Sequence, residues 1–204
     1  MEAIVLAGGM GTRLRPLTDT LPKPMVDVGG KPFLERVLSY LNEQGVATVC
    51  LSVGYKREAI SDYFGSQYKK IQLRYAVEDV PLGTGGAIKN ALPELTGDSV
   101  FVLNGDTLFE VNLSEMWRAH MRAGSALTIA VKPVPYAARY GAVMFDDSGT
   151  IVGFQEKGQS IQATINGGVY LVKREIVAGK PDRFSFEKDL LEKDFRSLKP
   201  QAFV

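Results

Sequence analysis

The sequence predicts an α/β fold, in which a mostly parallel sheet flanked by helices is followed by a smaller antiparallel part. In residues 1–124, short apolar runs typical of buried strands alternate with segments of helical periodicity, which is the pattern of βαβ units. From residue 125 onward, short strand-like runs follow one another across turns such as Asp147-Ser148-Gly149. We expect one continuous domain over residues 1–204, with halves at 1–124 and 125–204.

The first half begins with the apolar run of residues 3–7, which is too short for a helix and is typical of a buried strand. A helix is expected over residues 32–41, because its apolar side chains fall on one helical face and Pro32 suits a first turn. The same reasoning predicts strands over 46–53, 71–77 and 100–103, and helices over 56–64, 84–92 and 112–123, with Asn112 capping the last.

Three segments follow strands of this half directly: residues 8–13, 78–86 and 104–106. Parallel sheets bind ligands at the carboxyl ends of their strands. We therefore expect these segments to converge on one edge of the sheet.

The second half contains strand-like runs at 127–131, 140–145, 151–155 and 168–172. Their spacing favours antiparallel pairs. We expect them to form a lobe laid over the end of the first sheet.

Composition limits the class of protein. Hydrophobic residues make up 45% and charged residues 23% of the 204 residues, which is ordinary for a soluble globular domain. The formal net charge of +1 leaves no basic surplus for nucleic acid. No apolar run approaches the roughly twenty residues that span a membrane. The single cysteine, Cys50, lies in an apolar run and is expected in the core, so a cytoplasmic location is expected.

The segment from Leu6 to Pro16 is rich in glycine and arginine. Gly8, Gly9 and Gly11 allow turns with positive φ and bring backbone N–H groups close to an anion. Arg13, Arg15 and, further on, Lys23 add positive charge. The glycine spacing alone fits either a plain turn or a phosphate-binding loop, since it matches neither the Walker nor the dinucleotide pattern.

A longer string decides between these interpretations. Residues 7–14, Ala-Gly-Gly-Met-Gly-Thr-Arg-Leu, with Pro22-Lys23-Pro24 downstream, resemble the signature of the sugar-nucleotide pyrophosphorylases. These nucleotidyltransferases join a nucleoside triphosphate to a sugar 1-phosphate. The resemblance implies a Rossmann-like, GT-A-like fold. It also implies nucleotide binding at Leu6, Ala7, Gly8, Gly9, Gly11 and Thr12.

The segment from Glu78 to Gly86 is similar to the base-reading segment of guanylyltransferases in this family, which implies nucleotide contacts from Glu78, Pro81, Gly83 and Thr84. Its glycines are expected to let the backbone approach a flat ligand. Guanine presents N1–H and N2–H₂ as adjacent donors, which a carboxylate can accept, whereas uracil presents one donor between two acceptors. Guanine is favoured over the other bases, and an exposed surface glutamate is the alternative.

Asn104-Gly105-Asp106 follows a buried strand, where an isolated motif of this kind is usually a turn. With a phosphate loop at the same edge, we expect Asp106 to hold Mg²⁺ together with phosphate oxygens. In the second half, the segments around Gly141, Glu156-Lys157 and Asn166 occur in the order of the family's sugar-binding segments. The resemblance thus implies sugar-phosphate binding by Asn104, Gly141, Glu156, Lys157 and Asn166.

The implied reaction is in-line attack of the sugar phosphate on the α-phosphorus, with pyrophosphate leaving. It needs no activated nucleophile, because the attacking phosphate is already largely ionised at neutral pH. Arg13 is expected to hold the β- and γ-phosphates, Lys23 the α-phosphate and Lys157 the attacking phosphate, so Arg13, Lys23 and Asp106 are the expected catalytic residues. The lone His120 supports neither a catalytic triad nor a zinc site.

Residues 81–88 and 184–189 look most like the branch of D-glycero-α-D-manno-heptose 1-phosphate guanylyltransferases, which form GDP-heptose. Mannose 1-phosphate guanylyltransfer, uridylyl, thymidylyl or adenylyl transfer, and a non-catalytic nucleotide-sensing subunit are the alternatives. Family members usually continue into a segment with a second metal-binding aspartate, which is absent here. A shortened chain, substitution by Asp189 and weak metal binding each explain this, and shortening is favoured. A homo-oligomer is possible.

Overall fold

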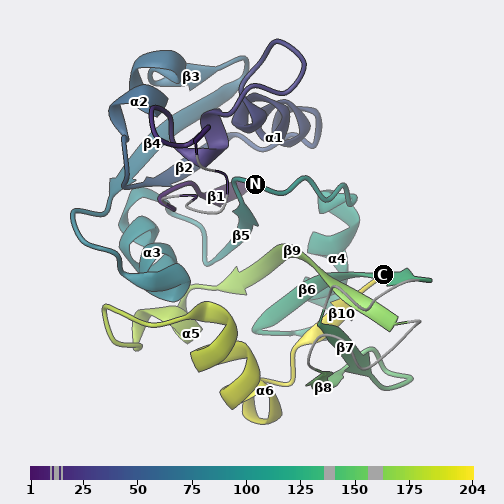
Figure 1. Ribbon diagram of the computed structural model, residues 1–204. Helices are drawn as coiled ribbons and strands as arrows, with labels where there is room; N and C mark the ends of the chain where they lie inside the picture. Colours follow the sequence, from purple (N-terminus) through teal and green to yellow (C-terminus); the bar gives the residue numbers. More distant parts are fainter. Residues whose placement is uncertain (10, 12–13, 15, 136–140, 156–162) are drawn as a thin grey trace.

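The computed structural model describes residues 1–9, 11, 14, 16–135, 141–155 and 163–204. Within them, one mixed sheet crosses both halves of the chain in the order β10-β6-β9-β5-β1-β2-β4-β3 (Figure 1). Its strands are β1 Glu2–Leu6, β2 Thr48–Val53, β3 Gln67–Tyr68, β4 Ile71–Val77, β5 Ser99–Asn104, β6 Leu127–Val134, β9 Ala163–Lys173 and β10 Gln201–Phe203, and β7 Ala142–Phe145 pairs with β8 Ile151–Gln155 beside β9.

The helical segments lie between these strands. They are η2 Lys23–Met25, α1 Phe33–Glu43, α2 Glu58–Phe64, α3 Gly83–Ala91, η3 Leu92–Glu94, α4 Leu113–Ala123, α5 Glu175–Ala178, the π-helix η4 Phe186–Leu191 and α6 Glu192–Leu198. The expected elements of the first half are all present, with ends that shift by one or two residues. Asn112 caps α4 as predicted, because its side chain accepts a hydrogen bond from the Glu115 amide.

The centre of the sheet is parallel, which confirms the prediction from the βαβ pattern. Strand β1 pairs in parallel with β2 and β5, so that Val5 aligns with Leu51 and with Leu103. Strand β2 in turn pairs in parallel with β4. All of these strands therefore end at the same edge of the sheet.

Both faces of the sheet are covered. Because side chains alternate along a strand, Ala3 and Val5 pack in one core with α1, α2 and α4, while Ile4 packs in the other with α3 and η4. Cys50 lies fully buried in the second core, as the sequence predicts, and burial raises the pKa of its thiol to about 12. The core thus has two layers, one on each face.

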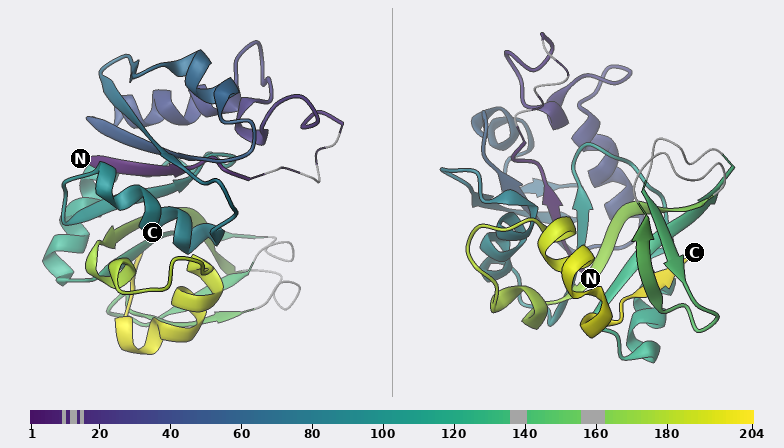
Figure 2. Two further views of the ribbon diagram at one scale, coloured as in Figure 1. Left: turned by 90° about the vertical axis from the view of Figure 1, so that its left-hand side faces the viewer. Right: turned by 60° about the horizontal axis from the view of Figure 1, so that its bottom comes forward.

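The second half differs from the expected lobe. Its antiparallel pairing is confirmed, but β9 pairs with β5, and β6 pairs with β9, so these strands extend the first sheet instead of covering its end. The reason is the length of β9, which runs over eleven residues. Its end, Val169–Lys173, pairs with β5 of the first half, while Ile165 near its start pairs with β7, so one strand belongs to both parts of the sheet. Figure 1 and the left view of Figure 2 show the second half, green to yellow, continuing below the first.

The sequence analysis did not predict the helical segments after β9. Residues 186–198 form η4 and α6, which pack on the face that carries α3. Strand β10 then pairs in parallel with β6 at the edge of the sheet. Among the described residues, no helix combines the length and the apolar character needed to cross a membrane.

Candidate active site

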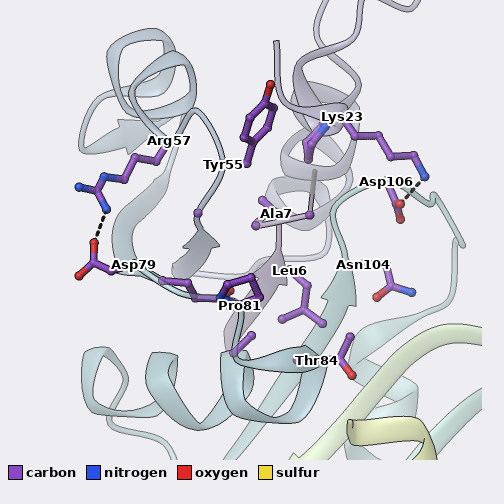
Figure 3. A pocket seen from close by; sticks show the side chains of 17 residues that line it. Leu6, Ala7, Lys23, Tyr55, Arg57, Asp79, Pro81, Thr84, Asn104 and Asp106 are labelled. Atoms are coloured by element: carbon purple, nitrogen blue, oxygen red, sulfur yellow. Dashed lines mark hydrogen bonds and ion pairs between the residues drawn. The ribbon is translucent and has the colours of Figure 1, made fainter. Parts of the chain in front are cut away.

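A cavity of about 570 Å³ opens at the carboxyl ends of β1, β2, β4 and β5 (Figure 3). The predicted residues that line it are Leu6, Ala7, Gly8, Gly9, Lys23, Glu78, Pro81, Gly83, Thr84, Asn104 and Asp106. The expected convergence of three distant segments on one edge is therefore confirmed for the residues that the structure describes. Thr12 and Arg13 lie outside them, and Gly11 does not line the cavity.

The glycine loop is built differently from the prediction. Of its described glycines, only Gly11 has a positive φ, at 61°, and a Cβ there would lie 2.8 Å from the Cβ of Lys23. Gly8 matters for a different reason, because a Cβ on it would lie 2.8 Å from Oε1 of Glu78 and would displace that carboxylate. The expectation of positive φ at Gly8 and Gly9 was wrong.

The carboxylate of Glu78 is fixed at the end of β4. Its Oε1 accepts a hydrogen bond from Ser52 Oγ at 2.8 Å, and its Oε2 accepts one from the Leu82 amide at 3.2 Å. A carboxylate accepts about four hydrogen bonds, so two positions remain for a ligand. Glu78 is thus a held acceptor on the cavity wall and not a freely solvated surface side chain.

The glycines after Glu78 also have a packing role that the sequence did not predict. A Cβ on Gly85 would lie 2.2 Å from the ring of Phe184, and one on Gly86 would lie 2.3 Å from the carbonyl oxygen of Asp182. Gly83 lines the cavity, but its missing Cβ would point at the Phe184 carbonyl, 2.6 Å away. These glycines make room for the segment before η4.

Two ion pairs lie at opposite sides of the cavity (Figure 3). Lys23 Nζ contacts Asp106 Oδ2 at 2.5 Å, and each side chain is about one-third exposed, at 35% and 36%. Across the cavity, Arg57 donates to Asp79 at 2.9 Å. The pair of Lys23 and Asp106 places a cation and a carboxylate side by side beside the glycine loop, where a phosphate and its metal ion would meet both.

A second cavity, of about 690 Å³, lies beside β7, β8 and the η4–α6 segment. Of the predicted sugar-phosphate residues, Gly141 and Asn166 line it, whereas Asn104 lines the first cavity. The Asn166 amide is held by Tyr170 OH, to which it donates at 2.9 Å, and by the Gly168 amide, from which it accepts. Glu156 and Lys157 lie outside the described residues.

Glu187 connects the two cavities. It lines the second, and its Oε2 accepts a hydrogen bond at 2.6 Å from Oγ1 of Thr84, which lines the first. Ser185 Oγ donates to the same oxygen at 3.3 Å. The other carboxylate oxygen has no hydrogen bond among the described residues, so the arrangement suits an acceptor for ligand hydroxyls.

Comparison with known proteins identifies the family. The family model described as nucleotidyl transferase matches residues 2–200. The chain belongs to the nucleotidyl transferase family. It is 46% identical to a D-glycero-alpha-D-manno-heptose 1-phosphate guanylyltransferase of Aneurinibacillus thermoaerophilus, an alignment that covers the whole chain and 89% of the relative.

Two further relatives agree with this family. A protein of the same name from Campylobacter jejuni is 39% identical over the whole chain and 90% of its own length. The crystal structure of HddC from Yersinia pseudotuberculosis complexed with GMP-PN superposes with a TM-score of 0.88 at 37% identity, covering the whole chain and 89% of HddC. The mostly parallel sheet flanked by helices is therefore the fold of solved nucleotidyl transferases.

Several residues of this nucleotidyl transferase were missed by the sequence analysis. Tyr55 and Arg57 line the first cavity because they follow β2, whose carboxyl end lies between those of β1 and β4. The rule that predicted the other three segments applies to this strand too, so the signal was present. Ser52 left no such signal. Glu187 lies in the segment 184–189 but was not predicted as a site residue, because its importance, like that of Ser52, depends on contacts between distant segments.

His120 is explained without a catalytic role. It is fully buried, and its ring lies between Thr128 Oγ1 at 2.8 Å and Ser99 Oγ at 3.4 Å. Burial lowers the pKa of His120 to about 4. The side chain is therefore neutral at physiological pH and connects elements of the core.

Proposed function

We propose that this nucleotidyl transferase joins GTP and D-glycero-α-D-manno-heptose 1-phosphate, giving GDP-heptose and pyrophosphate. The observation that carries the proposal is the first cavity, where a glycine loop, the Lys23–Asp106 pair and the held carboxylate of Glu78 lie on one sheet edge. Two relatives that match the whole chain bear the name of this guanylyltransferase.

In this proposal the triphosphate binds along the glycine loop, with Leu6, Ala7, Gly8 and Gly9 beside it and Lys23 neutralising charge at the α-phosphate. Glu78 accepts from guanine N1–H and N2–H₂. Pro81, Gly83 and Thr84 line the rest of the nucleotide site. Gly11 and Thr12 belong to the loop, and Arg13 is expected to hold the β- and γ-phosphates that leave.

The sugar 1-phosphate is proposed to bind toward the second cavity, with hydroxyls near Gly141, Asn166 and Glu187. Asn104 lies on the path between the phosphates and this cavity in the proposal, and Glu156 and Lys157 are expected to complete the site. An oxygen of the sugar phosphate then attacks the α-phosphorus while pyrophosphate departs on the opposite side. Catalysis consists of holding both phosphates in line and neutralising their charge.

Asp106 fits a magnesium ion. Its carboxylate, about one-third exposed, lines the cavity and already pairs with a cation, the ammonium group of Lys23. Magnesium favours one or two carboxylates together with phosphate oxygens, so a single aspartate is a suitable donor beside a triphosphate. When bound, the ion would neutralise charge on the phosphate oxygens. Among the described residues, no cluster of three or more metal-binding side chains competes for this role.

A second candidate is mannose 1-phosphate guanylyltransfer. A mannose-1-phosphate guanylyltransferase of Mycobacterium tuberculosis is 36% identical over 87% of this chain, but the alignment covers only half of that protein. Both candidates use GTP, so they differ only in the sugar.

The test is pyrophosphate release with Mg²⁺, measured for GTP, ATP, UTP and dTTP against heptose, mannose and glucose 1-phosphates. We expect release with GTP and the heptose phosphate, and none when the sugar phosphate is left out. Preference for mannose 1-phosphate would favour the second candidate, and preference for UTP or dTTP would exclude guanine recognition. Binding of GTP with no release from any pair would indicate a nucleotide-sensing protein.

A further inference from the structure

The carboxylate of Glu78 is positioned from the protein side by three neighbours. Ser52 Oγ donates to one oxygen at 2.8 Å, the Leu82 amide donates to the other at 3.2 Å, and Gly8 leaves space beside Oε1 that a Cβ would fill. The two backbone features remain under any substitution of Ser52. The hydroxyl of Ser52 is the one side-chain donor to Glu78 among the described residues.

Ser52 has no access to a ligand. It is 0% exposed at the carboxyl end of β2 and lines neither cavity. Its backbone carbonyl accepts from the Ala7 amide at 2.8 Å, which is an ordinary strand contact. A serine hydroxyl in this apolar strand is therefore explained by its bond to Glu78 and by nothing else that the structure describes.

We propose that Ser52 is a positioning residue that sets the selectivity for guanine. The proposal rests on the proposed function, in which Glu78 reads the base. The hydroxyl fixes the plane of the carboxylate, so that its two remaining acceptor positions match the adjacent N1–H and N2–H₂ donors of guanine. Without the hydroxyl, only the Leu82 amide holds the carboxylate, so rotation about its last carbon–carbon bond is less restricted and the pair of hydrogen bonds is less preorganised.

The readout is a ratio of affinities. Inosine triphosphate, ITP, lacks only the N2 amino group of GTP, so the ratio of its Kd to that of GTP measures the second hydrogen bond. We expect the unaltered protein to prefer GTP, and Ser52→Ala to reduce this preference about three- to tenfold in titration calorimetry. Ser61→Ala is the matched control, because Ser61 lies on α2, lines neither cavity and donates to the Glu58 carbonyl.

A merely structural serine would change stability and leave this ratio intact. The double variant Ser52→Ala with Glu78→Gln provides an internal check, since Ser52 should have no further effect on the ratio once the carboxylate is gone. Should Ser52→Ala fail to fold, Ser52→Cys keeps a similar volume with a much weaker donor and gives the same comparison.

An unchanged GTP to ITP preference in a folded Ser52 variant would overturn the inference alone. An unaltered protein that turns over UTP or dTTP in preference to GTP would overturn the guanine assignment of the proposed function, and the inference with it. The two failures are distinguishable because the second is visible before any variant is made.

Discussion

At the scale of single residues, Asp106 is held mainly by charge. Asp106 lies just after β5. The residue before it, Gly105, packs against the Leu6 carbonyl, and the Gly105 amide donates a hydrogen bond to that oxygen at 2.9 Å. Its carboxylate contacts Lys23 across 83 positions of the sequence. An ion pair this exposed contributes at most about 1 kcal/mol to stability, so loss of the Asp106 charge should affect folding little.

We therefore expect Asp106→Asn to reduce Mg²⁺-dependent pyrophosphate release by at least about 100-fold, because a metal ligand is lost. The melting temperature should change little. The matched control is Asp194→Asn, since Asp194 pairs with Lys180 at the same 2.5 Å, with both side chains 33% exposed, and lines neither cavity. Turnover that survives in the Asp106 variant would remove this residue from the metal site.

Glu187 allows a second test at this scale. Replacement by Gln removes the charge while the amide can still accept from Thr84. Hydrogen bonds to charged groups contribute about 1.5–3 kcal/mol, so we expect the KM for the sugar 1-phosphate to rise about tenfold or more. The KM for GTP should change less than twofold, and Glu175→Gln, on the exposed start of α5, should leave both values unchanged. An equal rise in both KM values would contradict a role in sugar binding.

At the scale of elements, the contact of α3 with the segment before η4 connects the two halves at the site. Lys89 of α3 donates to the Lys180 carbonyl and pairs with Asp182, and the amides of Gly85 and Gly86 donate to the Phe184 carbonyl. The close approach depends on the glycines of α3. Since Thr84 and Glu187 belong to the same contact, its geometry determines how the two cavities face each other.

Gly86→Ala tests this contact. In an open helix the change would stabilise by about 1 kcal/mol. Here the new Cβ would lie 2.3 Å from a backbone carbonyl, so we expect a net loss of about 1–3 kcal/mol in denaturant unfolding. Gly179→Ala is the control, because a Cβ there meets nothing within 4 Å and φ is −81°. If Gly86→Ala were as stable as the unaltered protein, the two segments could move apart with no loss of unfolding free energy, which would contradict this prediction.

The same elements mark what could be predicted from the sequence. Hydrophobic periodicity predicts the strands and helices of the first half. The rule for parallel sheets predicts that Gly8, Glu78 and Asp106 lie at one edge of the sheet, and all three line the first cavity. Contacts between distant segments carry no local pattern. Residue 86 has no room for a Cβ because of the carbonyl of Asp182, which lies 96 residues further along the chain. The Glu78 carboxylate accepts a hydrogen bond from Ser52, a buried serine on β2.

At the scale of the whole molecule, one sheet runs from β3 to β10 and contains strands of both halves of the chain. We therefore expect the two halves to unfold in a single cooperative transition. His120 reports on this transition. The side chain of His120, on α4, forms hydrogen bonds with Ser99 on β5 and with Thr128 on β6, two strands that belong to different halves of the chain. Its protonation should therefore be linked to global unfolding.

The sign of this linkage follows from the pKa of His120, about 4 in the folded protein against 6.5 for a free histidine side chain. The unfolded chain binds more protons between these values, so stability is full above pH 6.5 and falls as the pH decreases toward 4. We expect His120 to account for about 2–3 kcal/mol of the loss in unfolding free energy between pH 7.5 and 4.5. Carboxylates also titrate in this range, so the measurement is the difference between the unaltered protein and His120→Gln in urea unfolding. The variant should be less stable at pH 7.5 and show a shallower slope with pH, whereas parallel slopes would mean that His120 has the same pKa in the folded and unfolded chain.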